Sequence, residues 1–343
     1  MRSPKVSVII PAYNRAHLIG LTLQSVRAQA YSDFEIVVID DGSKDDTGRV
    51  VRETAPEARY IWQENVGLPE VLNVCVRAAR GEYVSFMGSD DAMLPGALER
   101  QARALDQNPS VGMVHGAAWL MDDGGSLTSV ARPSFAAGDY VHDGRQEIRR
   151  LLISNHIIAP TVMARRRCFD EVGLFKPDLR LYEDWDMWMR ILRRWDIAYV
   201  DDPITCYRVH LGEAGSVSLT ADPRVMERCR SVALNAALAG GDSSIPSQTA
   251  RRIWARHFYA IAEQAFYMGD MAYGIANAFK SIGRDPFGAQ GRSAIRLLMR
   301  HFVPAPLVHT ARRVRRNADS GNDRGNVRPT VEAVLRGAAL PEQ

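Results

Sequence analysis

The stretch VSVIIPAYNR, residues 6–15, decides the fold class of this chain. Its first five residues are mostly β-branched, which favours a buried strand. Pro11 then ends the strand, because proline cannot donate to a sheet ladder, and a polar segment follows at 13–15. Apolar residues recur at helical spacing from 19 to 30, which predicts an amphipathic helix. A strand, a polar loop and a helix in this order predict the first unit of an α/β sheet.

The same alternation continues to residue 110. Further strands are expected at 35–39, 59–62 and 83–87, and further helices from 45, over 68–80 and from Pro95. Pro95 supports a helix start because proline is favoured in the first helical turn. Strands that alternate with helices are joined by right-handed crossovers and lie parallel. We therefore expect an α/β fold with a Rossmann-like, mostly parallel sheet flanked by helices.

Polar segments follow three of these strands, at 11–15, 40–43 and 88–91. Ligands of open α/β sheets bind outside the carboxyl ends of the strands, so these segments are expected to form one site. In the third segment, Asp90 and Asp91 are adjacent carboxylates, which repel one another unless a cation or a proton intervenes. The pair fits a Mg²⁺ or Mn²⁺ site. It fits a solvated turn before a helix equally well.

The pattern changes after residue 110. Strands are expected at 111–120, 160–164, 197–200 and 204–207, with a helix carrying Trp185, Trp188 and Leu192 on one face. Residues 223–302 are helical in pattern. They include one tetratricopeptide-like helix pair at 262–286, which is too little for a repeat array.

These patterns divide the chain into three parts. An α/β domain is expected over 1–220, a C-terminal α-helical extension over 221–316, and a tail over 317–343. The tail is polar and glycine-rich, so it is expected to be disordered.

The composition narrows the class of protein. The chain has 343 residues, of which 46% are hydrophobic, enough for one large domain or a domain with an appendage. It contains no run of about 18 apolar residues, so no transmembrane helix is expected, and its N-terminus lacks the pattern of a signal peptide. The four cysteines form no CxxC pair and fit free thiols, which favours a cytoplasmic location. Walker A, GxGxxG, GxSxG and zinc-ligand patterns are absent.

The charge of the chain is uneven, although the net value is only +3. Seven arginines and no acidic residue lie between Arg292 and Arg316, interleaved at first with apolar residues. This pattern fits a basic amphipathic helix that lies peripherally on an anionic membrane surface. It fits a helix that packs on the domain with solvated arginines equally well. Aromatic residues are sparse in the stretch, which disfavours a nucleic-acid partner.

Several polar residues near the strand ends have two interpretations each. Asp41 is expected to accept a hydrogen bond from a nucleoside, whereas Asp45 and Asp46 are expected to cap a helix. Tyr13 could stack on a base or be a half-buried aromatic residue. Arg15 could face a phosphate or solvent.

Two residues further along the chain, Asp184 and His210, also have two possible roles each. Asp184 stands at a helix start, where it could cap the helix or act as a general base. The helix dipole would lower its pKa, and burial beside Tyr182 and Trp185 would raise it. His210 could ligate a metal or contact a diphosphate, but a lone histidine is more often structural.

Taken together, these segments resemble the family 2 glycosyltransferases, which have the GT-A fold. Each segment alone is weakly diagnostic, but their order is highly specific, and the resemblance spans residues 4–215. The segments are residues 6–15, 39–43, 63–68, 79–83, 89–91 and 183–186.

The resemblance implies an inverting transferase that moves a sugar from a nucleotide donor to an acceptor hydroxyl, in bacterial surface polysaccharide or glycolipid assembly. The implied donor-binding residues are Pro11, Ala12, Tyr13, Arg15, Asp40, Asp41, Asn65, Gly67, Asn73 and Asp90. Asp184 would be the catalytic base. Mn²⁺ or Mg²⁺ would be held by Asp91 and Asp90, with His210 at a position that helps in some relatives.

Two positions depart from the family pattern. Gly88 stands where many relatives have Asp, so the metal rests on fewer carboxylates, and Leu72 stands where many have an Arg that contacts base or phosphate. A UDP-sugar donor is favoured, with dTDP- and GDP-sugars open. A degenerate transferase scaffold that acts as an adaptor through its helical C-terminus is one alternative. A sugar-nucleotide pyrophosphorylase is another, disfavoured because 11–15 contains no glycine.

Overall fold

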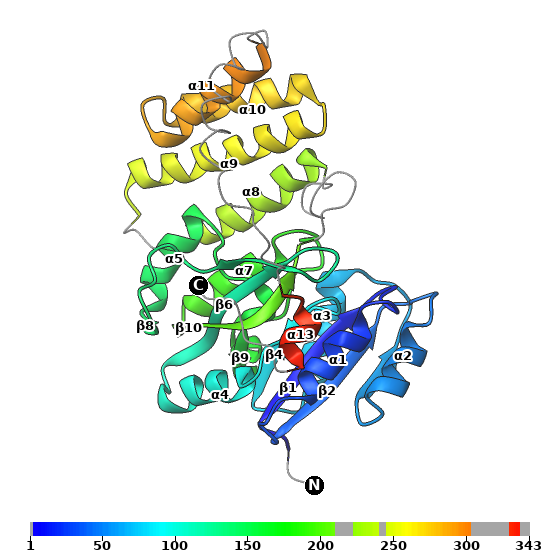
Figure 1. Ribbon diagram of the computed structural model, residues 1–343. Helices are drawn as coiled ribbons and strands as arrows, with labels where there is room; N and C mark the ends of the chain where they lie inside the picture. Colours follow the sequence, from blue (N-terminus) through cyan, green and yellow to red (C-terminus); the bar gives the residue numbers. More distant parts are fainter. Residues whose placement is uncertain (1–2, 210–221, 240–244, 303–328, 337–343) are drawn as a thin grey trace. The chain divides into compact units, whose positions relative to one another are not determined.

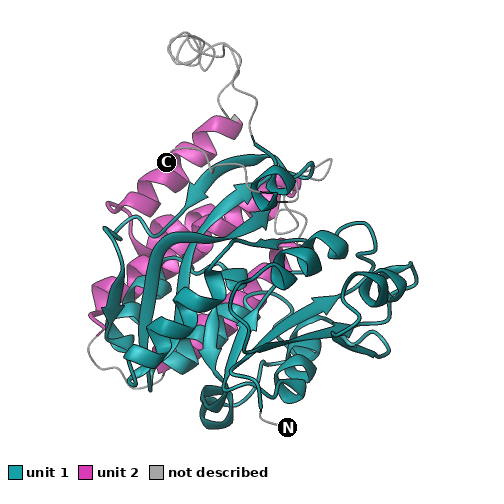
Figure 2. Ribbon diagram, turned by 60° about the horizontal axis from the view of Figure 1, so that its bottom comes forward, with its two compact units in different colours: residues 1–211, 329–343 teal, residues 212–328 magenta. Residues whose placement is uncertain are grey.

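The computed structural model describes residues 3–209, 222–239, 245–302 and 329–336. The chain forms two compact units, which are described separately below. The first comprises residues 1–211 and 329–343, and the second comprises residues 212–328 (Figure 2). His210, a predicted metal ligand, lies outside the described residues.

The first unit is built on a mixed sheet, seen in Figure 1, whose order is β3-β2-β1-β4-β9-β6-β10-β5, with β7 beside β6 and β8 beside β10. The strands are β1 (Val6–Ala12), β2 (Phe34–Asp40), β3 (Arg59–Trp62), β4 (Tyr83–Phe86), β5 (Ala92–Met93), β6 (Val111–Met121), β7 (Leu127–Ala131), β8 (Tyr140–His142), β9 (Met163–Arg165) and β10 (Asp196–Arg208). The first four strands are parallel, which confirms the α/β fold class.

The helices of this unit are α1 (Ile19–Arg27), α2 (Thr47–Thr54), α3 (Leu68–Ala78), α4 (Ala97–Gln107), α5 (Gly144–Ile153), α6 (Arg166–Val172) and α7 (Glu183–Leu192), with α13 (Val331–Leu335) far along the chain. Val8 and Ile10 of β1 and Leu23 of α1 are fully buried in one core cluster. The β-branched run at 6–10 therefore forms a strand because helices cover it.

The second half of the sheet differs in detail from the expectation. Strand β9 is short and antiparallel to β4 and β6, and the expected strand at 160–164 begins instead with a 3₁₀ turn, Ala159–Thr161. The two strands expected at 197–207 form one, β10, with an irregularity between Val200 and Pro203. The strand is interrupted there because Pro203 has no N–H to donate to β6.

The second unit is helical, as expected. It contains α8 (Pro223–Ala239), α9 (Ser247–Tyr267), α10 (Met271–Arg284) and α11 (Ala289–Phe302). Its core includes Ala262, Phe266, Ala278, Ala294 and Leu297. None of the helices in the described ranges has both the length and the apolar character that a membrane span requires.

One segment of the expected tail is ordered. Residues 329–336 pack in the first unit, where Val331 and Val334 are buried against Trp119 and Leu127. The Val331 N–H donates to the Gly125 carbonyl at 2.9 Å. The apolar pair therefore docks a segment that the polar composition of the tail conceals. The rest of the tail lies outside the described residues.

Candidate active site

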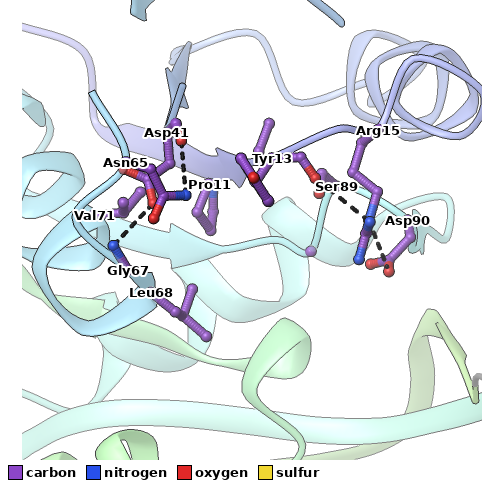
Figure 3. Close-up of a pocket in the computed structure, with 12 residues that line it drawn as sticks. Pro11, Tyr13, Arg15, Asp41, Asn65, Gly67, Leu68, Val71, Ser89 and Asp90 are labelled. Carbon is purple, nitrogen blue, oxygen red and sulfur yellow. Dashed lines mark hydrogen bonds and ion pairs between the residues drawn. The ribbon is translucent and has the colours of Figure 1, made fainter. Parts of the chain in front are cut away.

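A cavity of about 390 Å³ opens where the carboxyl ends of β1, β2 and β4 meet. We call it the first cavity (Figure 3). Its lining comprises Pro11, Ala12, Tyr13, Arg15, Asp41, Asn65, Gly67, Leu68, Val71, Gly88, Ser89 and Asp90. Eight residues predicted to bind the donor or metal are thus brought together: Pro11, Ala12, Tyr13, Arg15, Asp41, Asn65, Gly67 and Asp90.

Asp41 organises one wall of the first cavity. Its buried carboxylate accepts hydrogen bonds from the Gln63 side chain at 3.0 Å and from the N–H groups of Val66 and Gly67 at 2.9 and 3.0 Å. The Asn65 amide donates to the Asp41 carbonyl at 3.0 Å, as Figure 3 shows. Because three donors already hold this carboxylate, its orientation is set before any ligand binds.

Asp40 lies behind this wall and does not line the first cavity. Its carboxylate accepts from the Ser43 N–H at 2.8 Å and from the Tyr60 hydroxyl at 2.6 Å. Burial and this contact with Asp40 raise the pKa of Tyr60 above its usual value. The structure therefore gives Asp40 a supporting position, and no direct donor contact follows from it.

The loop after β1 presents an aromatic ring and a cation. Tyr13 is 45% exposed, so its ring is free to stack on a flat group. Asn14 adopts a positive φ of 52°. Its N–H donates to the Ser43 hydroxyl at 2.8 Å, which ties the loops after β1 and β2 together. Arg15 pairs with Asp90, with 3.5 Å between Nε and the carboxylate oxygen.

Asp91 does not reach the first cavity. Its side chain is 2% exposed, and one carboxylate oxygen accepts the Arg208 N–H at 2.8 Å. The other oxygen lies against Gly88, where a Cβ atom would overlap it. Burial, reinforced by the charge of Asp90, raises the pKa of Asp91 well above its usual value. The glycine therefore allows the Asp91 carboxylate to turn inward, away from the first cavity.

Arg208 holds the acidic pair from behind. Besides its N–H contact to Asp91, its guanidinium donates to the Asp90 carbonyl at 2.9 Å. The same guanidinium donates to the carbonyls of Asp122 and Asp123 at 3.0 and 2.8 Å. The turn at 122–126 is the one that Val331 binds. A continuous chain of contacts therefore links the C-terminal segment to the acidic pair.

A second, smaller cavity of about 140 Å³ adjoins the first, and both are lined by Pro11, Leu68 and Gly88. Its remaining lining residues are Leu72, Phe86, Met87, Ala159, Pro160, Phe175, Glu183, Asp184 and Trp188. Asp184, the predicted base, therefore lies in a cavity beside the one that collects the predicted donor-binding residues.

Burial dominates the electrostatics of the two acids at the start of α7. It raises the pKa of Asp184, opposed by hydrogen bonds from the Trp185 N–H at 2.6 Å and from the Asn155 amide at 3.3 Å. Burial and the neighbouring Asp184 raise the pKa of Glu183 to about 8. Tyr182, just before the helix, has a positive φ of 64°. Of the two roles expected for Asp184, general base and helix cap, the raised pKa favours the general base.

Asn73 is placed elsewhere. It is buried, its amide donates to the Phe175 carbonyl at 2.9 Å and its oxygen accepts the Phe175 N–H at 2.7 Å. These contacts hold α3 to the loop at 173–176. The structure therefore does not bring Asn73 to either cavity, contrary to the prediction.

Three residues beside the cavities were not singled out by the sequence: Gln63, Asn155 and Arg208. Gln63 and Arg208 lie within motifs that drew attention to their neighbours, whereas Asn155 carries no local signal. Their contacts to Asp41, Asp184 and Asp91 join residues far apart in the sequence.

Comparisons with known proteins agree with this architecture. The family described as "Glycosyl transferase family 2" matches residues 7–173. An "Uncharacterized glycosyltransferase" of Rickettsia felis is 31% identical over 226 residues, which are 63% of this chain and 36% of that protein. Residues 7–173 of the chain therefore belong to glycosyltransferase family 2.

Two further proteins illustrate the range of similarity. "Chondroitin synthase" of Escherichia coli is 29% identical over 220 residues, covering 63% of this chain and 30% of that protein. The chain thus spans about a third of the length of these two curated relatives. The structure of S. aureus TarS 1–349 in complex with UDP-GlcNAc superposes with a TM-score of 0.62 at 22% identity, covering 82% of this chain and 81% of that one. This similarity shows the GT-A fold.

Proposed function

We propose that the protein is an inverting glycosyltransferase that moves a sugar from a nucleotide donor to an acceptor hydroxyl. The observation that carries the proposal is the pair of adjoining cavities. The first collects an aromatic ring, backbone of the β1 end and an oriented carboxylate, and the second contains Asp184. Gly88 lines both, so a ligand in the first cavity can place a group beside Asp184.

The first cavity suits a nucleoside diphosphate. The exposed ring of Tyr13 provides a stacking surface for a base. Asp41 and Asn65 provide polar groups for the base or ribose, and Arg15 provides a cation near the diphosphate. Of the nucleotide sugars, a UDP-sugar remains the favoured donor.

Asp184 is proposed as the base. The acceptor hydroxyl transfers its proton to the Asp184 carboxylate while its oxygen forms a bond to the anomeric carbon. The bond from that carbon to the diphosphate oxygen breaks, and the diphosphate leaves with the electron pair. Attack opposite the leaving group inverts the anomeric configuration. The carboxylate must be ionised for this step, and its raised pKa makes it a stronger base than an exposed aspartate.

The acidic pair fits a divalent cation in part. Asp90 offers a carboxylate to the first cavity, and Asp91 lies behind it. Within the described residues, no three His, Cys, Asp or Glu side chains gather closely enough to hold a metal by themselves. Mg²⁺ sites commonly use one or two carboxylates together with substrate phosphates. Asp91, the other predicted metal ligand, is turned away from the first cavity in this structure. We therefore propose that Asp90 would hold Mn²⁺ or Mg²⁺ together with the donor diphosphate, where a bound cation would offset the leaving-group charge.

The acceptor is proposed to be a growing polysaccharide or glycolipid of the bacterial surface. The proposal follows from the family and from the name of the E. coli relative, a chondroitin synthase.

Helix α11 of the second unit supports the proposal that the protein contacts a membrane peripherally. Arg292, Arg296 and Arg300 lie on its exposed side together with Ile295 and Met299, which are 42% and 56% exposed. Among the described residues, none of these arginines forms an ion pair, and Ala294 and Leu297 pack the opposite side. Exposed cations beside exposed apolar residues suit the interface of an anionic membrane. Co-sedimentation with phosphatidylglycerol vesicles should be lost when Arg296 and Arg300 become glutamate. Equal sedimentation of wild type and variant would contradict the proposal.

Thermal unfolding tests the donor and metal proposals. UDP-, GDP- and dTDP-sugars are screened with and without Mn²⁺, since a ligand of the native state raises Tm. A UDP-sugar should give the largest shift, and Mn²⁺ should increase it. No shift with any nucleotide sugar would favour the adaptor alternative.

A further inference from the structure

The second cavity differs from the first in chemistry, and this difference deepens the proposed function, on which the following inference rests. Apart from Glu183 and Asp184, its side chains are apolar, including Leu72, Phe86, Phe175 and Trp188. A sugar hydroxyl placed against this wall would lose its hydrogen bonds to water without replacement, at a cost of about 1–3 kcal/mol.

The aromatic wall of the second cavity is well packed. The Phe86 ring lies edge-on to Trp188 with 5.4 Å between centroids, and edge-on to Phe175 with 6.0 Å between centroids. All three side chains are buried in the protein. Because these rings support one another, the wall cannot easily rearrange to provide a polar lining.

One polar group in this wall lacks a partner. The Trp188 side chain is 0% exposed, and its indole N–H finds no hydrogen-bond acceptor in the part of the chain that the structure describes. Buried indole N–H groups are normally paired. The ligand of this cavity is therefore expected to bring an acceptor oxygen, together with an apolar group that fills the space beside Leu72.

An acetamido group has this combination of a methyl group, a carbonyl oxygen and an amide N–H. We propose that the second cavity selects a donor sugar that carries an acetamido group. Its methyl group packs on the apolar wall and its carbonyl oxygen accepts the Trp188 N–H. Its amide N–H donates to a carboxyl oxygen of Glu183, which leaves Asp184 to the acceptor.

Matched donors test this inference. UDP-GlcNAc and UDP-glucose differ only in the acetamido group, as do UDP-GalNAc and UDP-galactose. We expect kcat/KM for UDP release to be at least about 10-fold higher for the acetamido sugar of the preferred pair. Trp188→Phe keeps an aromatic ring but removes the N–H, and it should reduce this ratio by about 10-fold. UDP alone, which lacks the sugar, should bind the wild type and Trp188→Phe equally.

A second variant covers the case in which Trp188→Phe does not fold. Leu72→Phe enlarges a side chain that lines only the second cavity, so it should lower kcat/KM for the acetamido donor more than for its hydroxyl counterpart. If the wild type has equal kcat/KM values for the two donors of each pair, the inference is overturned but the proposed function is not. An unchanged ratio in the variant that folds would also overturn the inference. If neither UDP nor any UDP-sugar binds the wild type, the proposed function fails, and the inference fails with it.

Discussion

Gly88 is the position where a single methyl group should have the largest effect on the site. A Cβ atom built on Gly88 overlaps one carboxylate oxygen of Asp91 and lies 3.1 Å from a carboxylate oxygen of Asp90. In Gly88→Ala, the Asp91 side chain must therefore turn away. It then loses the hydrogen bond that it accepts from the Arg208 N–H at 2.8 Å.

The expected loss can be worked from that contact. Losing this contact leaves the buried Arg208 N–H without its partner, which costs about 1–3 kcal/mol in the free energy of unfolding. In a unit of this size, each 1 kcal/mol shifts Tm by about 2–4 °C. We therefore expect Gly88→Ala to lower Tm by roughly 2–12 °C. Because the added Cβ atom also crowds Asp90, the proposed metal ligand in the first cavity, the additional Tm shift caused by Mn²⁺ with a UDP-sugar should also decrease.

Differential scanning calorimetry measures both effects. Gly20→Ala in α1 is the matched control in the same unit, since a Cβ there meets only ordinary contacts, at 3.5 and 3.8 Å, with Val50 and Thr54 of α2. This control should be neutral or stabilising by about 0.5–1 kcal/mol. If Gly88→Ala melts at the wild-type temperature and keeps the full Mn²⁺ effect, the inward position of Asp91 is refuted.

Three further predictions concern neighbouring groups. The pKa of Glu183 rises from its ordinary value of 4.5 to about 8 on folding. The free energy of unfolding should therefore decrease as pH rises through this window. Urea titrations should show this decrease for the wild type but not for Glu183→Gln. Asn155→Ala removes a hydrogen bond that lowers the pKa of Asp184, so the acid limb of the pH profile of kcat/KM should move to higher pH. An acid limb at the wild-type pH would contradict an effect of Asn155 on the pKa of Asp184. Val331→Asp buries a carboxylate in the apolar cluster behind Arg208, so it should lower Tm. It should also weaken the binding of UDP, measured by calorimetry. The exposed control Glu332→Ala should change neither Tm nor UDP binding.

The regular part of the fold could be predicted because its causes are local. The β-branched run of β1 is buried on both sides, and the Ile19–Val26 stripe of α1 faces the same core. Strand alternation then placed Asp41 and Asp90 at one edge of the sheet, where the structure has them.

Contacts between distant residues decided the details that the sequence did not reveal. Asp91 turns inward because Arg208, 117 residues away, donates to it. Asn73 leaves the site because the Phe175 backbone, 102 residues away, binds both ends of its amide. Neither partner can be located from local patterns, since such patterns report only neighbours along the chain.

The docked segment at 329–336 illustrates the same limit. Val331, Val334 and Leu335 are the residues of this segment that pack in the apolar cluster, and they can do so because Trp119 and Leu127 offer a complementary surface. Composition averages over such short segments, so a tail that is polar overall can still contain a docking element.

The central claim is that Asp184 acts as the base for a sugar held in the adjoining cavities. The most direct test compares the wild type with Asp184→Asn, which keeps the shape of the side chain but removes the base. We expect calorimetry to show similar affinity for the UDP-sugar, with UDP release slowed by at least about 100-fold. UDP release at the wild-type rate by Asp184→Asn would contradict the account.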